Sequence, residues 1–420
     1  MSNEQSITNK KSINVDLSFG FDMLITWLGF FVSIAVLLLV SRKNLPLALF
    51  SSAIVLGLFT ISPPTIGMKI YETLIDPSIL LLAVAMGLIP LIGGVMEESG
   101  QMDGLVNNLR IGKKSFLGIS PALIGMLPVP GGALLSAPLV ERVGEGIEPG
   151  RKASLNVWFR HILFLIYPIS PELIVSIEIA GLDVYDALPY LFPFFICSLL
   201  IGYVFFLRDI KGKIAYEKKF SVKDLMVPLM VIALVPILDF SIQRMVDLPL
   251  REISLIIAVI GSLSLSLSLS NLNPAKVLAI GKKMRIWHFA LIILGMFVFL
   301  NIFKASGVPE MLASANFSKP MLCVVIGFLL GIVTGRIQVP ASIIIPIYLA
   351  SSTLSFMQPS VFAITFFSIF LGYVISPIHP CVAISVEYFK IQIKDFLRAS
   401  ILPVSVGFLF ALVLGWLIIG

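Results

Sequence analysis

The pentapeptide Tyr-Pro-Ile-Ser-Pro at residues 167–171 returns as Tyr-Val-Ile-Ser-Pro at residues 373–377. Each copy lies within a long apolar segment, 153–181 in the first case and 359–385 in the second. Proline has no backbone donor, and it ends or kinks a helix. The matched pair therefore predicts two helices, each broken at a Ser-Pro step, and it indicates an internal repeat.

The composition of the chain is that of a membrane protein. Of the 420 residues, 58% are hydrophobic and 13% are charged, and the mean hydropathy is +1.01. A soluble domain cannot bury that much apolar surface inside one water-facing shell. This excludes a soluble enzyme, a nucleic-acid-binding module and a disordered chain. It predicts an all-α polytopic protein surrounded by membrane lipid, because the apolar runs are ~18–24 residues long and a membrane strand needs only ~10.

The apolar segments that we predict to be membrane elements are 22–40, 45–62, 77–97, 115–144, 153–181, 187–207, 224–242, 252–270, 286–306, 320–350, 359–385 and 400–419. Segments 115–144 and 320–350 are too long for one crossing of ~20 residues, and both carry Pro and Gly near the middle. We expect them to be re-entrant hairpins, each of which enters and leaves on one face of the membrane.

Residues 261–270 alternate serine and leucine with the period of a strand. A single strand in lipid would leave its backbone groups unsatisfied, so we predict a helix instead. Its serines are expected to bond to the preceding turn or to neighbouring helices.

The elements then occur in the same order in two halves of the chain, 22–207 and 224–420. Each half has five crossings, one of them broken by Ser-Pro, and one hairpin. Five is an odd number, so the second half is expected to be inverted relative to the first. Inverted repeats with broken helices are a common plan of secondary transporters, whose site lies near the midplane at the breaks. A polar tail, 1–21, precedes the first half, and a basic linker, 208–223, joins the two.

The basic residues predict the orientation of the chain. If both long segments are hairpins, lysine and arginine favour one set of loops by roughly three to one, and the linker 208–223 belongs to that set. Such residues gather in cytoplasmic loops. We therefore predict a multi-pass protein of the cell membrane with both termini outside. The net charge of +6 reflects this topology and does not indicate a nucleic-acid partner.

Both hairpins are long enough for their tips to reach the midplane. At 1.5 Å per residue, residues 115–128 span ~20 Å of helix and residues 319–336 span ~25 Å, against a hydrocarbon core of ~30 Å. Pro130, Gly131 and Gly132 suit the first tip, because proline stops a helix and glycine permits close approach of a ligand.

Ionisable residues near the breaks make up the candidate site. A charge at membrane depth costs ~2.5–3.5 kcal/mol on insertion scales. Arg336, at the second tip, is the leading ligand, because a guanidinium can hold a carboxylate or phosphate with two hydrogen bonds. Glu172 and His379 are the candidates for a coupling H⁺ or Na⁺. The substrate-binding candidates besides Arg336 are Thr334, Gln338, Pro130, Gly131, Gly132, Ser170, Ser376 and Arg160.

These residues also have structural interpretations. Arg336 or Arg160 could pair with Glu172 only to hold the fold, and Arg160 could extend towards the inner face. His379 could bond to a carbonyl. Cysteines 197, 323 and 381 all lie in apolar runs and are expected to be packed hydrophobes, with no disulfide and no metal site. No cofactor is expected.

The run 125–138, Gly-Met-Leu-Pro-Val-Pro-Gly-Gly-Ala-Leu-Leu-Ser-Ala-Pro, resembles an uncharacterised prokaryotic integral membrane family of the ion transporter superfamily. Relatives in that superfamily include gluconate, citrate, lactate and dicarboxylate permeases. The resemblance implies two inverted repeats with opposed hairpins, a homodimer, and an elevator-like movement of the hairpin domain. Dicarboxylate members carry Ser-Asn-Thr motifs at the tips, and residues 128–132 and 334–340 depart from that pattern.

Together these features predict an ion-coupled secondary active transporter of a small anion of the organic-acid class. A channel is an alternative, although an internal inverted repeat suits alternating access better than a pore built from subunit rings. An intramembrane enzyme is less favoured, because the sequence has neither a His-Glu-x-x-His nor a Gly-x-Ser-x-Gly motif. A scaffold protein would not need an arginine at a hairpin tip.

Overall fold

The computed structural model describes residues 23–126, 132–214, 216, 219–314 and 318–420, and the regular structure within these ranges is entirely helical. Seven of the described helices are long and apolar enough to cross a membrane. The prediction of an all-α polytopic membrane protein is confirmed. The tail 1–21 and the tip residues Pro130 and Gly131 lie outside the described residues.

In chain order the helices are Met23–Ser41, α2 (Leu45–Thr60), α3 (Pro63–Ile75), α4 (Pro77–Glu98), α5 (Gln101–Asn107), α6 (Lys113–Gly125), α7 (Ala133–Val143), α8 (Pro149–Ile162), η1 (Leu163–Leu165), α9 (Pro171–Ala180), α10 (Val184–Gly202), η2 (Tyr203–Leu207), α11 (Val222–Met245), α12 (Glu252–Ser268), α13 (Pro274–Met284), α14 (Ile286–Ala305), α15 (Val308–Ser314), η3 (Met321–Ile326), α16 (Gly327–Thr334), α17 (Gln338–Ser352), α18 (Pro359–Ile375), α19 (Pro380–Tyr388) and α20 (Ile393–Ile418).

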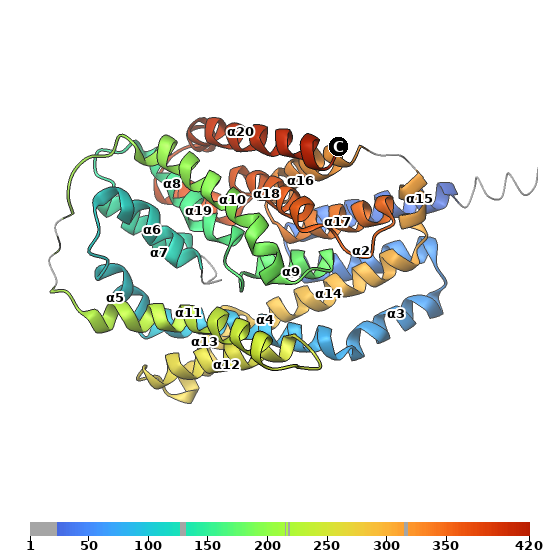
Figure 1. Cartoon of the computed structure of the whole chain (residues 1–420), viewed down its shortest axis with the longest axis horizontal. Helices are drawn as coiled ribbons and strands as arrows, with labels where there is room; N and C mark the ends of the chain where they lie inside the picture. The colour runs from blue at the N-terminus through green and yellow to red at the C-terminus, as the bar shows by residue number, and fades with distance from the viewer. Residues whose placement is uncertain (1–22, 127–131, 215, 217–218, 315–317) are drawn as a thin grey trace, which may run out of the picture.

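The helices pack as two groups (Figure 1). In the first, which we call the framework group, α14 packs against α2, α3 and α4, while α12 packs against α4 and α11. In the second, the hairpin group, α8 packs against α6, α7, α19 and α20, while α18 packs against α10, α16 and α20. Figure 1 shows α11, α12 and α13 in the lower part of the bundle and α20 along its upper edge. The hairpins and both broken helices therefore belong to one group.

The two halves of the chain have the same order of elements and reciprocal packing. α2 packs against α14 as α12 packs against α4, and α7 packs against α19 as α17 packs against α9. Short helices also recur at matching places, with α3 and α13 before the third long helix of each half and α5 and α15 before each hairpin. These four helices were not predicted, because at 7–13 residues they are too short and too polar to appear as membrane segments. The opposite membrane orientation of the halves stays a prediction.

Both Ser-Pro breaks are present. α8 ends at Ile162 and α9 begins at Pro171, while α18 ends at Ile375 and α19 begins at Pro380. Each second piece begins with proline, whose missing N–H is not needed in the first turn. The side chain of Ser170 accepts a hydrogen bond from the amide of Leu173 at 3.2 Å and caps α9.

Each predicted hairpin is a pair of helical arms whose bases lie together. At the base of the first, Lys113 Nζ donates to the carbonyl of Glu145 at 3.2 Å. At the base of the second, Lys319 Nζ lies 6.0 Å from the centre of the Tyr348 ring. Figure 1 shows α6 and α7 at the left end of the bundle and the arms of the second hairpin, α16 and α17, to the right of its centre, with α15 beyond them. The arms therefore return to the end from which they start, as a re-entrant segment requires.

Residues 261–270 confirm the helical prediction, because α12 continues to Ser268. The hydroxyl of Ser262 donates to the carbonyl of Val231 on α11 at 2.7 Å. The hydroxyl of Ser268 bonds back to the carbonyl of Leu265 at 2.9 Å. These two serine hydroxyls thus bond to a neighbouring helix and to the preceding turn, as expected.

Several predicted boundaries differ from the structure by a few residues, among them those of α2, α12 and α20. α2 has 16 residues and α12 has 17, which is slightly shorter than the predicted segments, and the helix that follows each of them begins with proline. α20 begins at Ile393 and not at residue 400. Its early start comes from a capping box between Gln392 and Asp395. Hydropathy does not predict this first turn as part of the membrane segment, because the turn contains charged residues.

Candidate functional site

The breaks and the hairpin tips converge inside the hairpin group. Arg160 and His161 lie in the last turn of α8, and His379 caps the start of α19; all three are at most 4% exposed. A Cβ atom at Gly335, the second tip, would lie 2.9 Å from the backbone nitrogen of His379. Gly335 has φ +58°, a conformation that glycine tolerates. Residues from both halves of the chain thus meet in one buried place.

Arg160 lies directly against the first tip. A side chain at Gly132 would collide with its Nη2 atom, so only glycine leaves room for the guanidinium. The Nη1 atom is buried and has no hydrogen-bond partner in the described part of the chain. The guanidinium also interacts with the thiol of Cys381. The side chain therefore stays inside the protein, without extending to the membrane face, and retains unused donor capacity.

Glu172 lies in the first turn of α9, next to the second tip. Its Oε1 atom accepts a hydrogen bond from the side-chain amide of Gln338 at 3.5 Å. Its Oε2 atom is buried and has no partner among the described residues. The ion pairs within those residues involve other side chains, so neither Arg160 nor Arg336 pairs directly with Glu172. Their charges act on the carboxylate only at longer range.

The second tip is shaped by its own side chains. The Thr334 hydroxyl lies 2.8 Å from the carbonyl of Leu330 and 3.0 Å from that of Arg336, and it accepts from the Arg336 amide at 3.3 Å. The Arg336 side chain is partly buried, and it forms no hydrogen bond or ion pair within the described ranges. The backbone turn is therefore fixed, while the guanidinium remains available.

Three predicted hydroxyl ligands are engaged with the backbone. Thr334 holds the second tip, and Ser170 caps α9. Ser376 donates to the carbonyl of Ile332 on α16 at 2.6 Å, which ties the second break to the second hairpin. These side chains position the site, and their hydroxyls already have partners.

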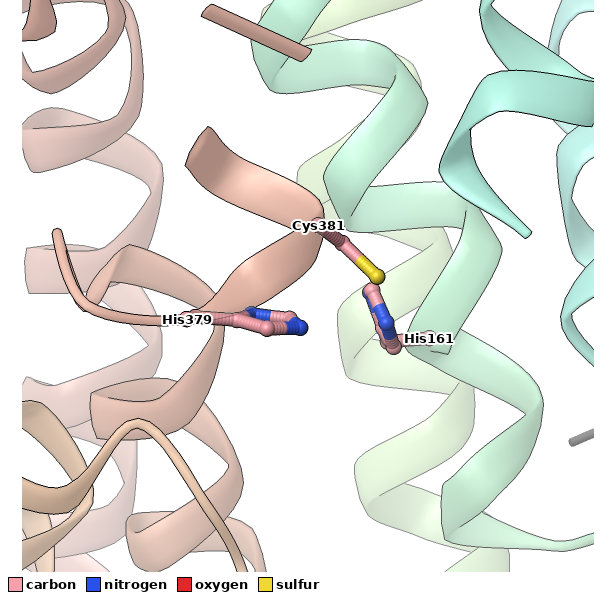
Figure 2. A group of neighbouring side chains, drawn as sticks. All are labelled: His161, His379 and Cys381. Atoms are coloured by element: carbon pink, nitrogen blue, oxygen red, sulfur yellow. The ribbon is translucent and has the colours of Figure 1, made fainter. Parts of the chain in front are cut away.

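A cluster of rings and a thiol lies beside Arg160. The ring of His379 stacks on Tyr373 with centroids 4.0 Å apart, and the ring of His161 lies 4.7 Å from that of His379. Cys381 completes the cluster, as Figure 2 shows. The site predicted from the sequence includes neither His161 nor Cys381. The local signal was there, because Cys381 follows His379 by two positions after the Ser-Pro break, but the meeting with His161 is a tertiary contact.

A cavity of about 730 Å³ separates parts of the two groups. Residues of α4 and α14 line one side of it, and residues of α9 and α17 line the other. Its polar and charged lining residues include Asp76, Glu178, Asn301, Lys304 and Glu310. The ends of the second hairpin and the first broken helix thus face open space towards the framework group.

The family model described as "Protein of unknown function (DUF401)" matches residues 24–420. No curated protein matches the chain. The fold is similar to the crystal structure of the YdaH transporter of Alcanivorax borkumensis, with a TM-score of 0.59 and 15% sequence identity over 92% of this chain and 97% of that chain. At this identity the likeness concerns the fold. Membership of the ion transporter superfamily, with its gluconate and citrate permeases, stays a prediction.

Proposed function

The chain belongs to the DUF401 family, and we propose that it is a secondary transporter that carries a small anion across the membrane, coupled to H⁺ or Na⁺. The similarity of its fold to that of the YdaH transporter supports transport. The broken helices and opposed hairpins support it independently, because transporters with such helices bind their substrate at the breaks.

The positive charges of the site are the main support for the proposal that the substrate is an anion. Arg160 has a buried, unpartnered Nη1 atom, and the guanidinium of Arg336 has no partner in the described residues. Glu172 pairs directly with neither of them. An uncompensated cation in a low-dielectric interior is costly. A bound carboxylate or phosphate would satisfy both guanidinium groups, and an organic acid is the simplest substrate of that kind.

The residues of the site then have distinct roles. Arg336 and Arg160 bind the anion, and Pro130, Gly131 and Gly132 let the first tip approach it. Glu172 carries the coupling ion, since its Oε2 atom is unpartnered, and Gln338 orients that carboxylate. Thr334, Ser170 and Ser376 hold the surrounding backbone in place.

Movement of the hairpin group past the framework group would alternate access to this site. The hairpins, both broken helices and the candidate ligands all belong to one group. The cavity of about 730 Å³ between α4 and α14 on one side and α9 and α17 on the other provides space along this boundary. This arrangement supports an elevator-like mechanism.

The decisive experiment compares anion binding and uptake in variants of Arg336. Purified protein is screened against organic and inorganic anions by thermal shift, and the best ligand is then assayed in proteoliposomes. Arg336→Gln should cost ~2–5 kcal/mol of binding free energy if the pair is desolvated. Arg336→Lys should weaken binding less, because it keeps the charge and loses the planar fork.

Arg244→Gln is the matched control, because Arg244 is exposed at the end of α11. It should bind and transport like the wild type. Normal affinity and uptake in Arg336→Gln, at matched protein amounts, would show that this arginine is structural. Uptake that never accumulates the anion against its gradient, whatever ion gradient is imposed, would indicate a channel instead.

A further inference from the structure

His161, His379 and Cys381 form a second cluster in the hairpin group, and the proposed anion site does not use it. One ligand atom from each residue, a ring nitrogen or the sulfur, lies within 4.8 Å of the other two. Figure 2 shows the sulfur of Cys381 and the ring of His379 directed towards His161. His161 comes from the end of α8, and the other two come from the start of α19.

The ring of His161 is already oriented as a metal ligand. Its Nδ1 atom lies 2.7 Å from the carbonyl oxygen of Val157. A carbonyl can only accept, so Nδ1 carries the proton, and the lone pair of Nε2 is left for another partner. Metal-binding histidines are commonly fixed in this way by an outer hydrogen bond.

His379 also has a ring nitrogen that is free to act as a ligand. The residue is 1% exposed, and its Nδ1 atom is buried without a hydrogen-bond partner in the described residues. Leaving such an atom unsatisfied is unfavourable. Cys381 lies beside it with its thiol against the guanidinium of Arg160, and a cysteine that binds a metal does so as the thiolate.

We propose that these three residues bind Zn²⁺. Two imidazole nitrogens and a thiolate are ligands that zinc prefers, whereas Na⁺, Mg²⁺ and Ca²⁺ take oxygen ligands, which the trio does not offer. In a tetrahedral site with Zn–N of ~2.0–2.1 Å and Zn–S of ~2.3 Å, ligand atoms lie roughly 3.3–3.7 Å apart. Closing from 4.8 Å or less therefore requires side-chain shifts of roughly 1 Å.

Three protein ligands leave the fourth position of the zinc to an exchangeable ligand. The charges around it are those of Arg160 and Arg336, which oppose the cation, and those of the Cys381 thiolate and Glu172, which favour it. In this arrangement His379 is a metal ligand, and Glu172 retains the coupling role.

The metal would join the first piece of one broken helix to the second piece of the other. α8 and α19 belong to different halves of the chain, and they already pack together. A zinc ion between them would hold the two breaks in register inside the hairpin group. The inference goes beyond the proposed anion transport and does not depend on it.

The test uses the full-length protein purified in detergent, in a background with Cys197→Ser and Cys323→Ser, so that Cys381 is the sole thiol. After stripping with a chelator, exposure to Zn²⁺ and desalting, it should retain about one zinc per chain, the number that one three-ligand site holds. Loaded with Co²⁺ instead, it should show a thiolate-to-metal charge-transfer band. That band can come only from Cys381.

Two variants remove a ligand and preserve the packing. Cys381→Ser keeps nearly the same shape, and His161→Phe keeps a ring against His379 and Tyr373. Each should lower zinc affinity by about 100-fold or more, since even the loss of an outer partner costs ~10–100-fold. His288→Phe, a histidine on α14 outside the cluster, is the matched control and should bind zinc normally.

If the parent protein shows no charge-transfer band and retains no zinc, the cluster is an aromatic packing contact and the proposal is wrong. Unchanged zinc affinity in both ligand variants would overturn it as well. These measurements involve no transport substrate, so their failure would leave the anion proposal intact, and failure of anion transport would leave the zinc site intact.

Discussion

At the scale of single residues, the buried charged side chains have only part of their hydrogen-bonding atoms satisfied. Glu172 has one oxygen bonded to Gln338 and one with no partner in the described residues. Arg160 fits against Gly132 and keeps one unpaired nitrogen. Desolvated groups of this kind are costly unless a ligand compensates them. Arg160 and Glu172 thus retain hydrogen-bonding capacity that a bound anion and a coupling ion would use.

Replacing Glu172 with glutamine should uncouple the transporter. Glutamine keeps the shape and the contact with Gln338 but cannot carry H⁺ or a charge that binds Na⁺. We expect Glu172→Gln to lose ion-driven accumulation in proteoliposomes while exchange of substrate across the membrane continues. Glu178→Gln, on the same helix and lining the cavity, is the control. Unchanged accumulation in Glu172→Gln would assign the carboxylate a structural role.

Replacing Gly132 with alanine should displace the guanidinium of Arg160. The added Cβ would collide with Nη2, which is the far end of a flexible side chain, so the protein should still fold. We expect Gly132→Ala to lower anion affinity by about 10-fold or more, corresponding to ~1.4 kcal/mol or more, measured by ligand-induced thermal shift. Gly112→Ala is the control, because nothing lies within 4 Å of its Cβ position. Equal affinity in both variants would remove Arg160 from the binding site.

At the scale of elements, the breaks depend on caps and close packing. Ser170 caps α9 through the amide of Leu173, and Ser376 ties the end of α18 to α16. The hairpin arms approach the broken helices closely because glycine lies at the contacts. A Cβ at Gly125 would collide with the carbonyl of Arg160, and one at Gly372 would collide with that of Phe328. In both halves of the chain, glycine thus allows a hairpin arm and a broken helix to pack closely.

Loss of the cap should destabilise the first broken helix. Ser170→Ala removes the acceptor for the Leu173 amide, and such a change typically costs ~0.5–2 kcal/mol. We expect a lower midpoint of denaturant unfolding in detergent, with anion affinity reduced secondarily. Ser62→Ala is the comparison, because Ser62 precedes α3 without a side-chain capping bond. A loss of stability no larger than that of Ser62→Ala would show that the cap is unimportant.

At the scale of the whole molecule, two halves with the same order of elements contribute to one buried site. Reciprocal contacts join them, since α7 packs against α19 and α17 packs against α9. The hairpins start from opposite ends of the bundle in Figure 1. An inverted repeat would explain both features, because two-fold related halves place equivalent elements on opposite faces.

The inverted arrangement predicts that the bases of the two hairpins are exposed on opposite faces of the membrane. Glu145 follows α7, Ser355 follows α17, and both are exposed. Single cysteines at these positions, in a background without the native cysteines, should react with an impermeant reagent from opposite sides. Lys211→Cys in the linker should label from the same side as Glu145→Cys. Labelling of Glu145→Cys and Ser355→Cys from one side would contradict the inverted scheme.

Local physical chemistry makes much of this fold predictable from the sequence. Long apolar runs require helices in lipid, because a helix satisfies its own backbone. Proline removes a backbone donor and favours a break, and Tyr167–Pro171 and Tyr373–Pro377 indicated both breaks correctly, although other prolines such as Pro90 and Pro403 lie inside continuous helices. The short helices and the early start of α20 escaped prediction, because they depend on caps and turns in polar sequence and not on hydropathy.

Only the tertiary structure decided which side chains meet. His161 and Cys381 are far apart in the chain, and their proximity follows from the packing of α8 against α19. The same packing determined that Thr334 and Ser376 serve the backbone while Arg160 and Glu172 keep atoms without partners. Hydropathy and proline act over a few residues of one segment, whereas a contact between distant segments depends on how closely their helices can approach, and that distance is determined by the small residues at each crossing.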